Sequence, residues 1–376
     1  MTSARVPLRT GWTTGSCATA ATAAAFEALL TSAFPDPVTI TLPGGAEVAF
    51  ALAVTELAAD RATVGVVKDA GDDPDVTHGA LIKATLRLLP PSAGVRFMAG
   101  EGVGTVTLDG LTLPVGEPAI NPVPRQMMRD AIARVGARLK LAELPGVEIT
   151  VSIPGGEEIA IRTLNGRLGI VGGLSILGTT GIVRPYSCAA WIHGIHDGID
   201  VARANGLGHV AGGTGRTSEK AVLLHHGLPE TALIDMGDFV GGMLKYLRTH
   251  PVPRVTVAGG VAKMTKLAQG MLDVHSKRGG VDLSLLAKLA EQAGGGPALS
   301  QAILACNTGA QAFDLALEQD VGLGDAVAAA AWRTAAKVLD NETVALDVLL
   351  FDRVGGLRGS TPPRPAQPPA APRNRR

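Results

Sequence analysis

The feature that most constrains the fold is a strand, glycine-loop and helix unit that occurs twice in the second half of the chain. Residues 207–227 read LGHVAGGTGRTSEKAVLLHHG, and residues 253–272 read PRVTVAGGVAKMTKLAQGML. Strands that alternate with helices predict parallel βαβ units and an open sheet. We therefore expect residues 181–355 to form an open, Rossmann-like α/β domain.

The first half follows a different pattern. Residues 38–52, VTITLPGGAEVAFAL, alternate apolar and polar side chains about a Pro-Gly-Gly turn and predict a β-hairpin. Residues 146–164 contain the same turn and predict a second hairpin. Residues 81–89, LIKATLRLL, and residues 121–139, which have prolines near the start, predict helices. Together these elements predict an α+β domain with a largely antiparallel sheet over residues 1–180.

The composition excludes several classes of protein. A length of 376 residues favours two domains, and 34 basic residues balanced by 34 acidic ones argue against a broad nucleic-acid-binding face. We expect no transmembrane helix and no secretory signal, and hence a cytoplasmic protein without a membrane partner. Three widely separated cysteines predict no disulfide framework. The proline- and arginine-rich residues 356–376 are expected to be a disordered tail.

An acidic loop, KDAGDDPDVTHGA, covers residues 68–80. Its four aspartates repel one another, which leaves three interpretations open. The loop could be a solvated turn in which Asp75 or Thr77 caps a following helix, an active-site loop, or a calcium loop. The glutamate that closes a calcium loop at position 12 is absent, so a structural metal is the least favoured interpretation.

Two further patterns concern ligand binding. The turn at residues 210–220, VAGGTGRTSEK, lies where a strand meets a helix and favours anion or ligand binding. It lacks the Walker lysine, because Arg216 stands there, and the third Rossmann glycine, because Ser218 stands there. His193 and His196 have helical spacing, but ordinary polar contacts explain them better than zinc, and no protein-bound metal is expected.

Six stretches together resemble one family. They are TGWTTGSCATAATAAA, KDAGDDPDVTHGA, GEPAINPVPR, RLGIVGGLSILGTTGIVRP, MGDFVGGML and KMTKLAQGMLDVHS, in this order along the chain. Their order resembles that of the CbiD family, the cobalt-precorrin-5B C1-methyltransferases of corrin-ring biosynthesis, from about residue 8 to residue 350. The chain departs from the family pattern at Trp12, at residues 259–263 and at the Asp273-Val274 pair. These departures affect the expected contacts of the second glycine turn and not the resemblance itself.

The resemblance implies a function and its small-molecule partners. S-adenosylmethionine would donate a methyl group to C1 of cobalt-precorrin-5B, a ring-contracted tetrapyrrole, to give cobalt-precorrin-6A. The cobalt would be carried by the substrate. The resemblance also implies that the α+β domain precedes the α/β domain, and we expect the former to bind the tetrapyrrole and the latter the donor. A homo-oligomer would be compatible with the sequence.

Site residues follow for this chemistry. Methyl transfer from a sulfonium needs alignment more than a nucleophilic residue, and a general base would come from the acidic loop. The candidate bases are Asp69, Asp72 and His78. Carboxylates on the tetrapyrrole would be bound by hydroxyls and amides at a helix start and by arginines, namely Thr13, Thr14, Gly15, Ser16, Arg125 and Arg184. The donor is assigned by elimination to the two glycine turns, at Gly212, Gly213, Thr214, Gly215, Arg216, Gly259 and Lys263.

Two rival functions also fit the residues. A nucleotide-dependent ligase or kinase could use the turn near Gly212, although the missing Walker lysine counts against it. A tetrapyrrole carrier could hold the ring without altering it, and the mass of the product would distinguish a carrier from an enzyme.

Overall fold

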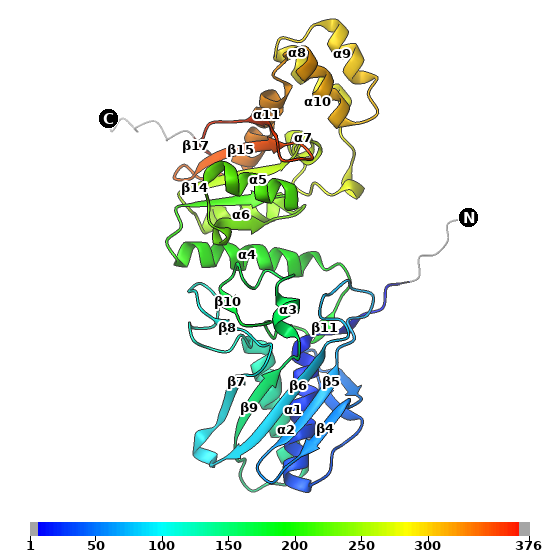
Figure 1. The fold of residues 1–376 in the computed structure, drawn as a ribbon, viewed down its shortest axis with the longest axis vertical. Helices are drawn as coiled ribbons and strands as arrows, with labels where there is room; N and C mark the ends of the chain where they lie inside the picture. Colours follow the sequence, from blue (N-terminus) through cyan, green and yellow to red (C-terminus); the bar gives the residue numbers. More distant parts are fainter. Residues whose placement is uncertain (1–6, 368–376) are drawn as a thin grey trace, which may run out of the picture. The chain divides into compact units, whose positions relative to one another are not determined.

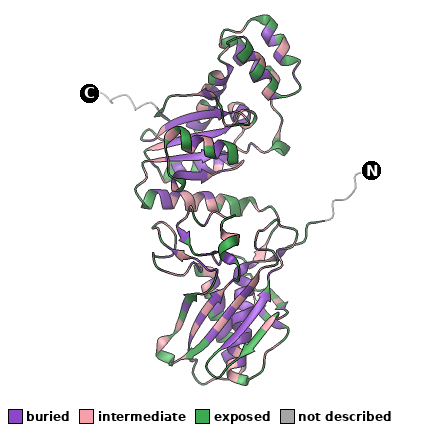
Figure 2. Cartoon of the chain, in the orientation of Figure 1, coloured by how far each residue is buried: buried purple, intermediate pink, exposed green. Residues whose placement is uncertain are grey.

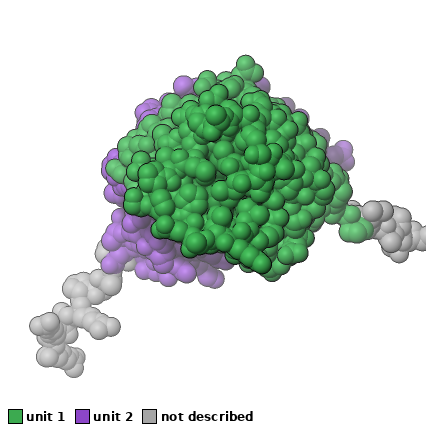
Figure 3. Space-filling view, turned by 90° about the horizontal axis from the view of Figure 1, so that it is seen from below, with its two compact units in different colours: residues 1–187 green, residues 188–376 purple. Residues whose placement is uncertain are grey.

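The computed structural model describes residues 7–367, and the chain divides into two compact units after Ser187 (Figures 1 and 3). Each unit contains its own sheet and its own large cluster of buried apolar side chains. The N-terminal unit ends at residue 187 and the C-terminal unit begins at Cys188.

The N-terminal unit is built on a five-stranded sheet. Its strands, in spatial order, are β4 (Val54–Leu57), β5 (Ala62–Val67), β6 (Leu81–Leu89), β9 (Gly146–Ser152) and β7 (Val95–Ala99). All neighbours are antiparallel except β9 and β7, which run parallel. Figure 2 colours much of the central strands as buried. The largely antiparallel sheet predicted for this half is confirmed.

Two helices pack on this sheet. Helix α1 (Thr14–Thr31) contacts β5, β6 and the second helix, α2 (Pro122–Arg138). Alanines occupy half of the buried positions of α1, and they allow strands and helix to approach closely on several sides at once. A helix that is apolar around most of its circumference must be buried, and α1 is the centre of this unit's core.

Short strand pairs complete the unit. The predicted hairpin forms from β2 (Val38–Thr41) and β3 (Glu47–Phe50). Strand β8 (Thr105–Val106) pairs with β10 (Ile170–Val171). Strand β1 (Gly11–Trp12) pairs with β11 (Ile182–Val183), which brings the glycine-rich segment before β11 to the start of α1. A single 3₁₀ turn, Pro91–Ala93, precedes β7.

Two secondary-structure predictions for this unit are wrong. Residues 81–89 form strand β6 rather than a helix, because Ile82, Ala84 and Leu86 alternate into the core with a period of two. The second Pro-Gly-Gly turn does not begin a hairpin. It leads into the short helix α3 (Gly156–Ala160), whose first turn carries Glu157 and Glu158, and acidic side chains at that end favour a helix.

The C-terminal unit contains the predicted parallel sheet. Its strand order is β13 (Leu233–Asp235), β12 (His209–Gly213), β14 (Arg254–Gly260), β15 (Ala345–Phe351) and β16 (Leu357–Ser360). The first four strands are mutually parallel, and β16 is antiparallel. The strand, loop and helix units read from the sequence are therefore confirmed.

Helices cover the two faces of this sheet unequally. One face carries a small apolar cluster under α5 (Arg216–His226), including Val222 and Leu349. The opposite face carries the main core, to which the other long helices contribute. These helices are α4 (Cys188–Ala204), α6 (Val240–Thr249), α7 (Val261–Ala268), α8 (Leu283–Gln292), α9 (Pro297–Leu304), α10 (Gly309–Glu318) and α11 (Leu323–Leu339).

The boundary predicted for the disordered tail, residue 356, is too early in the chain, because residues beyond it are ordered in strands. Strand β16 and the short strand β17 (Arg364–Pro365) both pair with β15, and Ala366 is buried in the main core. The Arg364 guanidinium lies 3.8 Å from the centre of the Trp332 ring. Proline is tolerated in a strand at a sheet edge, so the proline-rich composition did not prevent pairing. The remainder of the tail, residues 368–376, lies outside the described residues.

Candidate functional site

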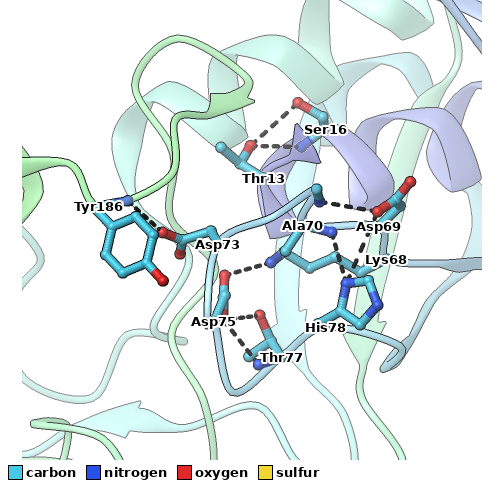
Figure 4. Close-up of polar contacts among 11 residues, drawn as sticks. Thr13, Ser16, Lys68, Asp69, Ala70, Asp73, Asp75, Thr77, His78 and Tyr186 are labelled. Carbon is cyan, nitrogen blue, oxygen red and sulfur yellow. Dashed lines mark hydrogen bonds and ion pairs between the residues drawn. The ribbon is translucent and has the colours of Figure 1, made fainter. Parts of the chain in front are cut away.

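The polar groups at the start of α1 are buried and bonded within the chain (Figure 4). The Thr13 hydroxyl accepts the Ser16 backbone N–H at 3.2 Å, so Thr13 is the N-cap of the helix. The Ser16 hydroxyl donates to the Gly181 carbonyl at 2.7 Å, and the Gly15 N–H donates to the Leu177 carbonyl at 3.2 Å. Carbonyl and hydroxyl oxygens of the chain thus take the Gly15 and Ser16 donors that were expected to bind a substrate carboxylate.

This contact explains two glycines. A Cβ on Gly178 would lie 2.4 Å from the Thr13 side chain, and one on Gly181 would lie 2.8 Å from the Ser16 hydroxyl. Both glycines also have positive φ. These bonds give Thr13, Gly15 and Ser16 a structural role, in which they hold the segment before β11 against the helix. Because their donors are already bonded, the geometry argues against a carboxylate cradle at these three residues, and Thr14 is buried beside them.

The acidic loop, residues 68–80, is organised by ion pairs. The Asp69 carboxylate pairs with the Arg9 guanidinium and accepts the Gly71 N–H, and these hydrogen bonds lower the pKa of Asp69 to about 2. Asp72 accepts the Arg9 backbone N–H at 2.7 Å. Asp69 is therefore ionised near neutrality and is a weak base.

The His78 ring is fixed by a hydrogen bond that it accepts from the backbone. Its Nδ1 accepts the Ala70 backbone N–H at 3.1 Å. A neutral imidazole that accepts at Nδ1 carries its proton on Nε2. The Nε2–H can donate to an anion, and the side chain is about half exposed.

Beneath the loop lies a buried ion pair that the motif analysis did not single out. The Lys68 ammonium lies 2.5 Å from an Asp75 carboxylate oxygen, and the Lys68 side chain is only 1% exposed. Asp75 also accepts the backbone N–H and the hydroxyl of Thr77. Burial opposes ionisation of Asp75, but the Lys68 charge and these hydrogen bonds lower its pKa. A lysine directly after a buried strand was the available signal.

The loop also reaches the end of this unit's chain. Asp73 accepts the Tyr186 backbone N–H at 2.8 Å, and Tyr186 has a positive φ (Figure 4). The solvated-turn interpretation had Asp75 or Thr77 cap a following helix, but strand β6 follows the loop. The Asp75 carboxylate still accepts the Thr77 backbone N–H, but this hydrogen bond closes a local turn and does not cap a helix.

The two candidate arginines of this unit differ. Arg125 donates to the Ile120 and Pro118 carbonyls, pairs with Glu117 at 2.8 Å and lies over the Phe97 ring. These partners use its donors to hold the segment before α2. Arg184 follows β11, and its side chain is exposed.

In the C-terminal unit, a cavity of about 760 Å³ opens where parallel strands end. The residues directly after β12, the ends of β14 and β15 and the first residues of α5, α7 and α10 form its wall. Ligands of open α/β sheets collect at this position, because backbone amides and helix dipoles point there. Of the predicted donor residues, Thr214, Gly215, Arg216 and Lys263 line the cavity.

The other predicted glycines lie behind the cavity. A Cβ on Gly212 would meet the Met243 sulfur at 2.4 Å, and one on Gly213 would meet Glu219 Cγ at 2.4 Å. A Cβ on Gly259 would lie 2.7 Å from both the Met264 sulfur and the Thr214 hydroxyl. These glycines allow close packing of helices on the strands, so they shape the wall without lining it.

Charged groups surround the cavity. The Lys263 ammonium donates to the Thr214 carbonyl at 2.5 Å and pairs with Asp238 at 3.0 Å, which closes the turn after β12. Arg358 pairs with Asp352 at 3.0 Å. Arg216, at the start of α5, is exposed toward solvent.

Part of the cavity lining lies outside the residues predicted from the motifs. The residues that the motifs did not predict end or follow β15, lie on β16 or begin α10: Thr308, Gln311, Asp314, Phe351, Asp352, Arg353 and Arg358. The strand-like run ALDVLLF followed by DRVGG was the available signal, because a third parallel strand would end at the same edge.

Comparisons with known proteins cover nearly the whole chain. Residues 1–185 match the family model described as CbiD, and residues 273–362 match the model described as CbiD, C-terminal domain. A protein of Agrobacterium fabrum named cobalt-precorrin-5B C(1)-methyltransferase is 60% identical over 96% of this chain and 95% of its own length. A protein of the same name from Bradyrhizobium is 60% identical over 98% of this chain and 97% of its own length.

A solved structure, a cobalamin biosynthesis protein (cbiD) from Archaeoglobus fulgidus, is 26% identical and aligns over 72% of this chain and 83% of its own, with a TM-score of 0.38. Within residues 7–367, no helix combines the length and apolar character needed to cross a bilayer. On the strength of the two family models and the 60% identical relatives, this chain belongs to the CbiD family.

Proposed function

We propose that this chain transfers a methyl group from S-adenosylmethionine to C1 of cobalt-precorrin-5B and releases cobalt-precorrin-6A. The observation that carries the proposal is the 60% identity, over nearly full length, to relatives named for this C1-methylation. Conservation over both units favours retention of the whole reaction rather than of one binding step.

The donor is assigned to the cavity of the C-terminal unit. We describe the open parallel sheet of this unit as Rossmann-like. The cavity's volume of about 760 Å³ lies within the range of about 300–1,000 Å³ that holds small molecules. Arg216 and the first amides of α5 suit the donor's carboxylate. Asp314, which is exposed at the cavity wall, suits its ammonium or sulfonium charge. S-adenosylmethionine supplies the methyl group as an electrophile.

The protein's contribution to this chemistry is alignment. The electron-rich ring supplies the carbon nucleophile, the S–CH₃ bond breaks as the C–CH₃ bond forms, and S-adenosylhomocysteine leaves. Holding two reactants in line can lower a barrier by about 7–11 kcal/mol. Asp69 is a weak base and His78 presents an N–H, so these residues bind and orient anionic groups better than they remove a proton.

The tetrapyrrole is assigned to the N-terminal unit. Its peripheral carboxylates would meet the exposed guanidinium of Arg184 and the Nε2–H of His78. Asp72 and Asp73, which fix the loop by accepting backbone N–H groups, would position His78. The free thiols of Cys17, Cys188 and Cys306 support a cytoplasmic location. The proposed partners also include a second copy of this chain, in a homo-oligomer.

The mass of the product tests the proposal. The full chain is incubated with S-adenosylmethionine and cobalt-precorrin-5B, and the ring is analysed by mass spectrometry. We expect a gain of one methyl group at C1 and an equal amount of S-adenosylhomocysteine. A tightly bound ring of unchanged mass would instead identify a carrier.

Titration calorimetry tests the donor site separately. We expect S-adenosylmethionine and S-adenosylhomocysteine to bind with a stoichiometry near one per chain. If neither binds alone, the titration is repeated with the tetrapyrrole present, since the donor site could require the ring. If neither binds with the ring present, the assignment of the donor fails.

A further inference from the structure

A polar cluster lies at the amino-terminal ends of the C-terminal strands, away from the cavity. His209 begins β12, Asp347 is the third residue of β15, and His226 ends α5. Thr256, on β14, pairs in register with Asp347. Because the cavity is formed by the opposite ends of these strands, this cluster is separate from the proposed donor site.

The Thr256 hydroxyl is the centre of the cluster. It donates to an Asp347 carboxylate oxygen at 3.0 Å, and its oxygen lies 2.7 Å from His209 Nε2 and 3.2 Å from His226 Nε2. His226 Nε2 lies 3.4 Å from the same carboxylate oxygen. Thr256 is fully buried, and Asp347 is 1% exposed. Three side chains of metal-ligating type thus converge on the buried Thr256 hydroxyl; Asp347 is buried and the two histidines are partly exposed.

One of the separations in this cluster already matches the needs of a small metal ion. Tetrahedral zinc with bonds of about 2.0–2.1 Å holds its ligand atoms about 3.3 Å apart. His226 and Asp347 already have this separation, and the ligand atoms of His209, His226 and Asp347 all lie within 4.8 Å of one another. We propose that these three side chains bind one divalent ion of the zinc class, with water as a fourth ligand.

The protonation states suit this binding. Burial lowers the pKa of His209 to about 4 and also lowers that of His226, so both rings are neutral near pH 7. Neutral imidazole nitrogen is a preferred ligand of zinc. Each Nε2 becomes available when its proton moves to Nδ1, which leaves the net charge of the ring unchanged.

Arg254 sets the strength of the site. Its guanidinium contacts both oxygens of Asp347, at 3.1 and 3.3 Å. One carboxylate oxygen can bind the ion while the other keeps the arginine, an arrangement in which the arginine orients the ligand from outside. The positive charge of Arg254 opposes the ion, so the affinity is lower than that of a closed zinc site.

A metal here would be structural. It would join the end of α5 to the beginnings of β12 and β15. The other end of α5, at Arg216, lies at the cavity. The ion would lie at the far end of these elements from the cavity, so it has no part in methyl transfer. Binding that is restricted to the folded state raises the melting temperature.

The test uses the full chain without a polyhistidine tag. Zn²⁺ is titrated in competition with a chromophoric chelator, and Co²⁺ is titrated while its visible absorption is recorded. We expect one saturable site per chain, four-coordinate Co²⁺ spectra and a higher melting temperature with Zn²⁺. His226→Gln and Asp347→Asn should each weaken binding at least about tenfold.

The control is His225→Gln, which alters the exposed neighbour of His226 on the same helix. It should leave both the affinity and the cobalt spectrum unchanged. Absence of saturable binding would overturn the proposal, and so would binding that survives Asp347→Asn or is lost in His225→Gln. Circular dichroism on each variant separates loss of the site from loss of the fold, and His209→Gln provides an independent third variant.

Discussion

The start of α1 and the start of α5 look alike in sequence but differ in what their polar groups do. At α1, the hydroxyls of Thr13 and Ser16 and the Gly15 amide are bonded to the protein's own atoms. At α5, Thr214, Gly215 and Arg216 border a cavity of about 760 Å³. A run of small polar residues before a helix therefore has two outcomes. The parallel strand that precedes α5 is what leaves its groups open to a ligand.

The largest effect is expected where internal bonding in the N-terminal unit is broken. Asp75→Asn leaves the Lys68 ammonium, 1% exposed, without its anion. Loss of one partner of a buried ion pair costs about 3–5 kcal/mol, so we expect the free energy of unfolding to fall by that order in a denaturant titration.

The matched control for this change is Glu56→Gln, on the exposed strand β4, which should stay within about 0.5 kcal/mol of the parent. Equal stability of Asp75→Asn and the control would mean that the loop is not held by its ion pair.

The next effect concerns the open helix start. Arg216→Ala removes a charged donor from the cavity wall. Hydrogen bonds to charged groups contribute about 1.5–3 kcal/mol, so the Kd for S-adenosylmethionine in titration calorimetry should rise roughly 10- to 100-fold. Lys220→Ala, on the same helix but outside the lining, is the control and should bind like the parent. Equal weakening of both variants would point to a general loss of positive charge.

A smaller effect is expected at the closed helix start. Thr13→Ala removes the N-cap of α1, which should lower the free energy of unfolding by about 0.5–2 kcal/mol. Because the Thr13 hydroxyl is bonded within the chain, tetrapyrrole affinity measured by absorption titration should not change. A large loss of tetrapyrrole affinity at unchanged stability would restore the carboxylate-cradle hypothesis.

The smallest effect is the pH dependence of the Arg9–Asp69 pair. The pKa of Asp69 falls from 3.8 to about 2 on folding, so its stabilising contribution is present above pH 3.8 and is lost as the pH drops toward 2. Unfolding of the parent and of Arg9→Gln should therefore differ slightly above pH 4 and converge near pH 2. Both side chains are about half exposed, which keeps the difference small. A difference that persists at pH 2 would assign another role to Arg9.

The predictability of the fold followed the strength of the local pattern. The strand and helix of residues 207–227 were predictable because a glycine loop separates two distinct periods. Residues 81–89 were not, because apolar residues at 81, 82, 86, 88 and 89 fit a helix while Ile82, Ala84 and Leu86 fit a strand. Only pairing with β5 and β9 decides between them.

The candidate site was predictable in the same uneven way. Arg216 and Lys263 were found because each follows a recognisable strand. The pairing of Ser16 with Gly181 and the convergence of His209, His226 and Asp347 depend on contacts between distant segments, which no spacing rule reports. Local periodicity predicts elements, whereas tertiary contact determines which polar groups remain available.

Strands β16 and β17 have a further consequence for how this chain avoids its own aggregation. Both cover the side of β15 that does not face β14. Without them, the long apolar strand Ala345–Phe351 would present an unpaired row of backbone N–H and carbonyl groups, which is a template for pairing with another molecule. A chain shortened to Gly356 should thus keep most of its core and yet associate through this exposed edge. The last described residues therefore protect the edge of the sheet from pairing with another molecule.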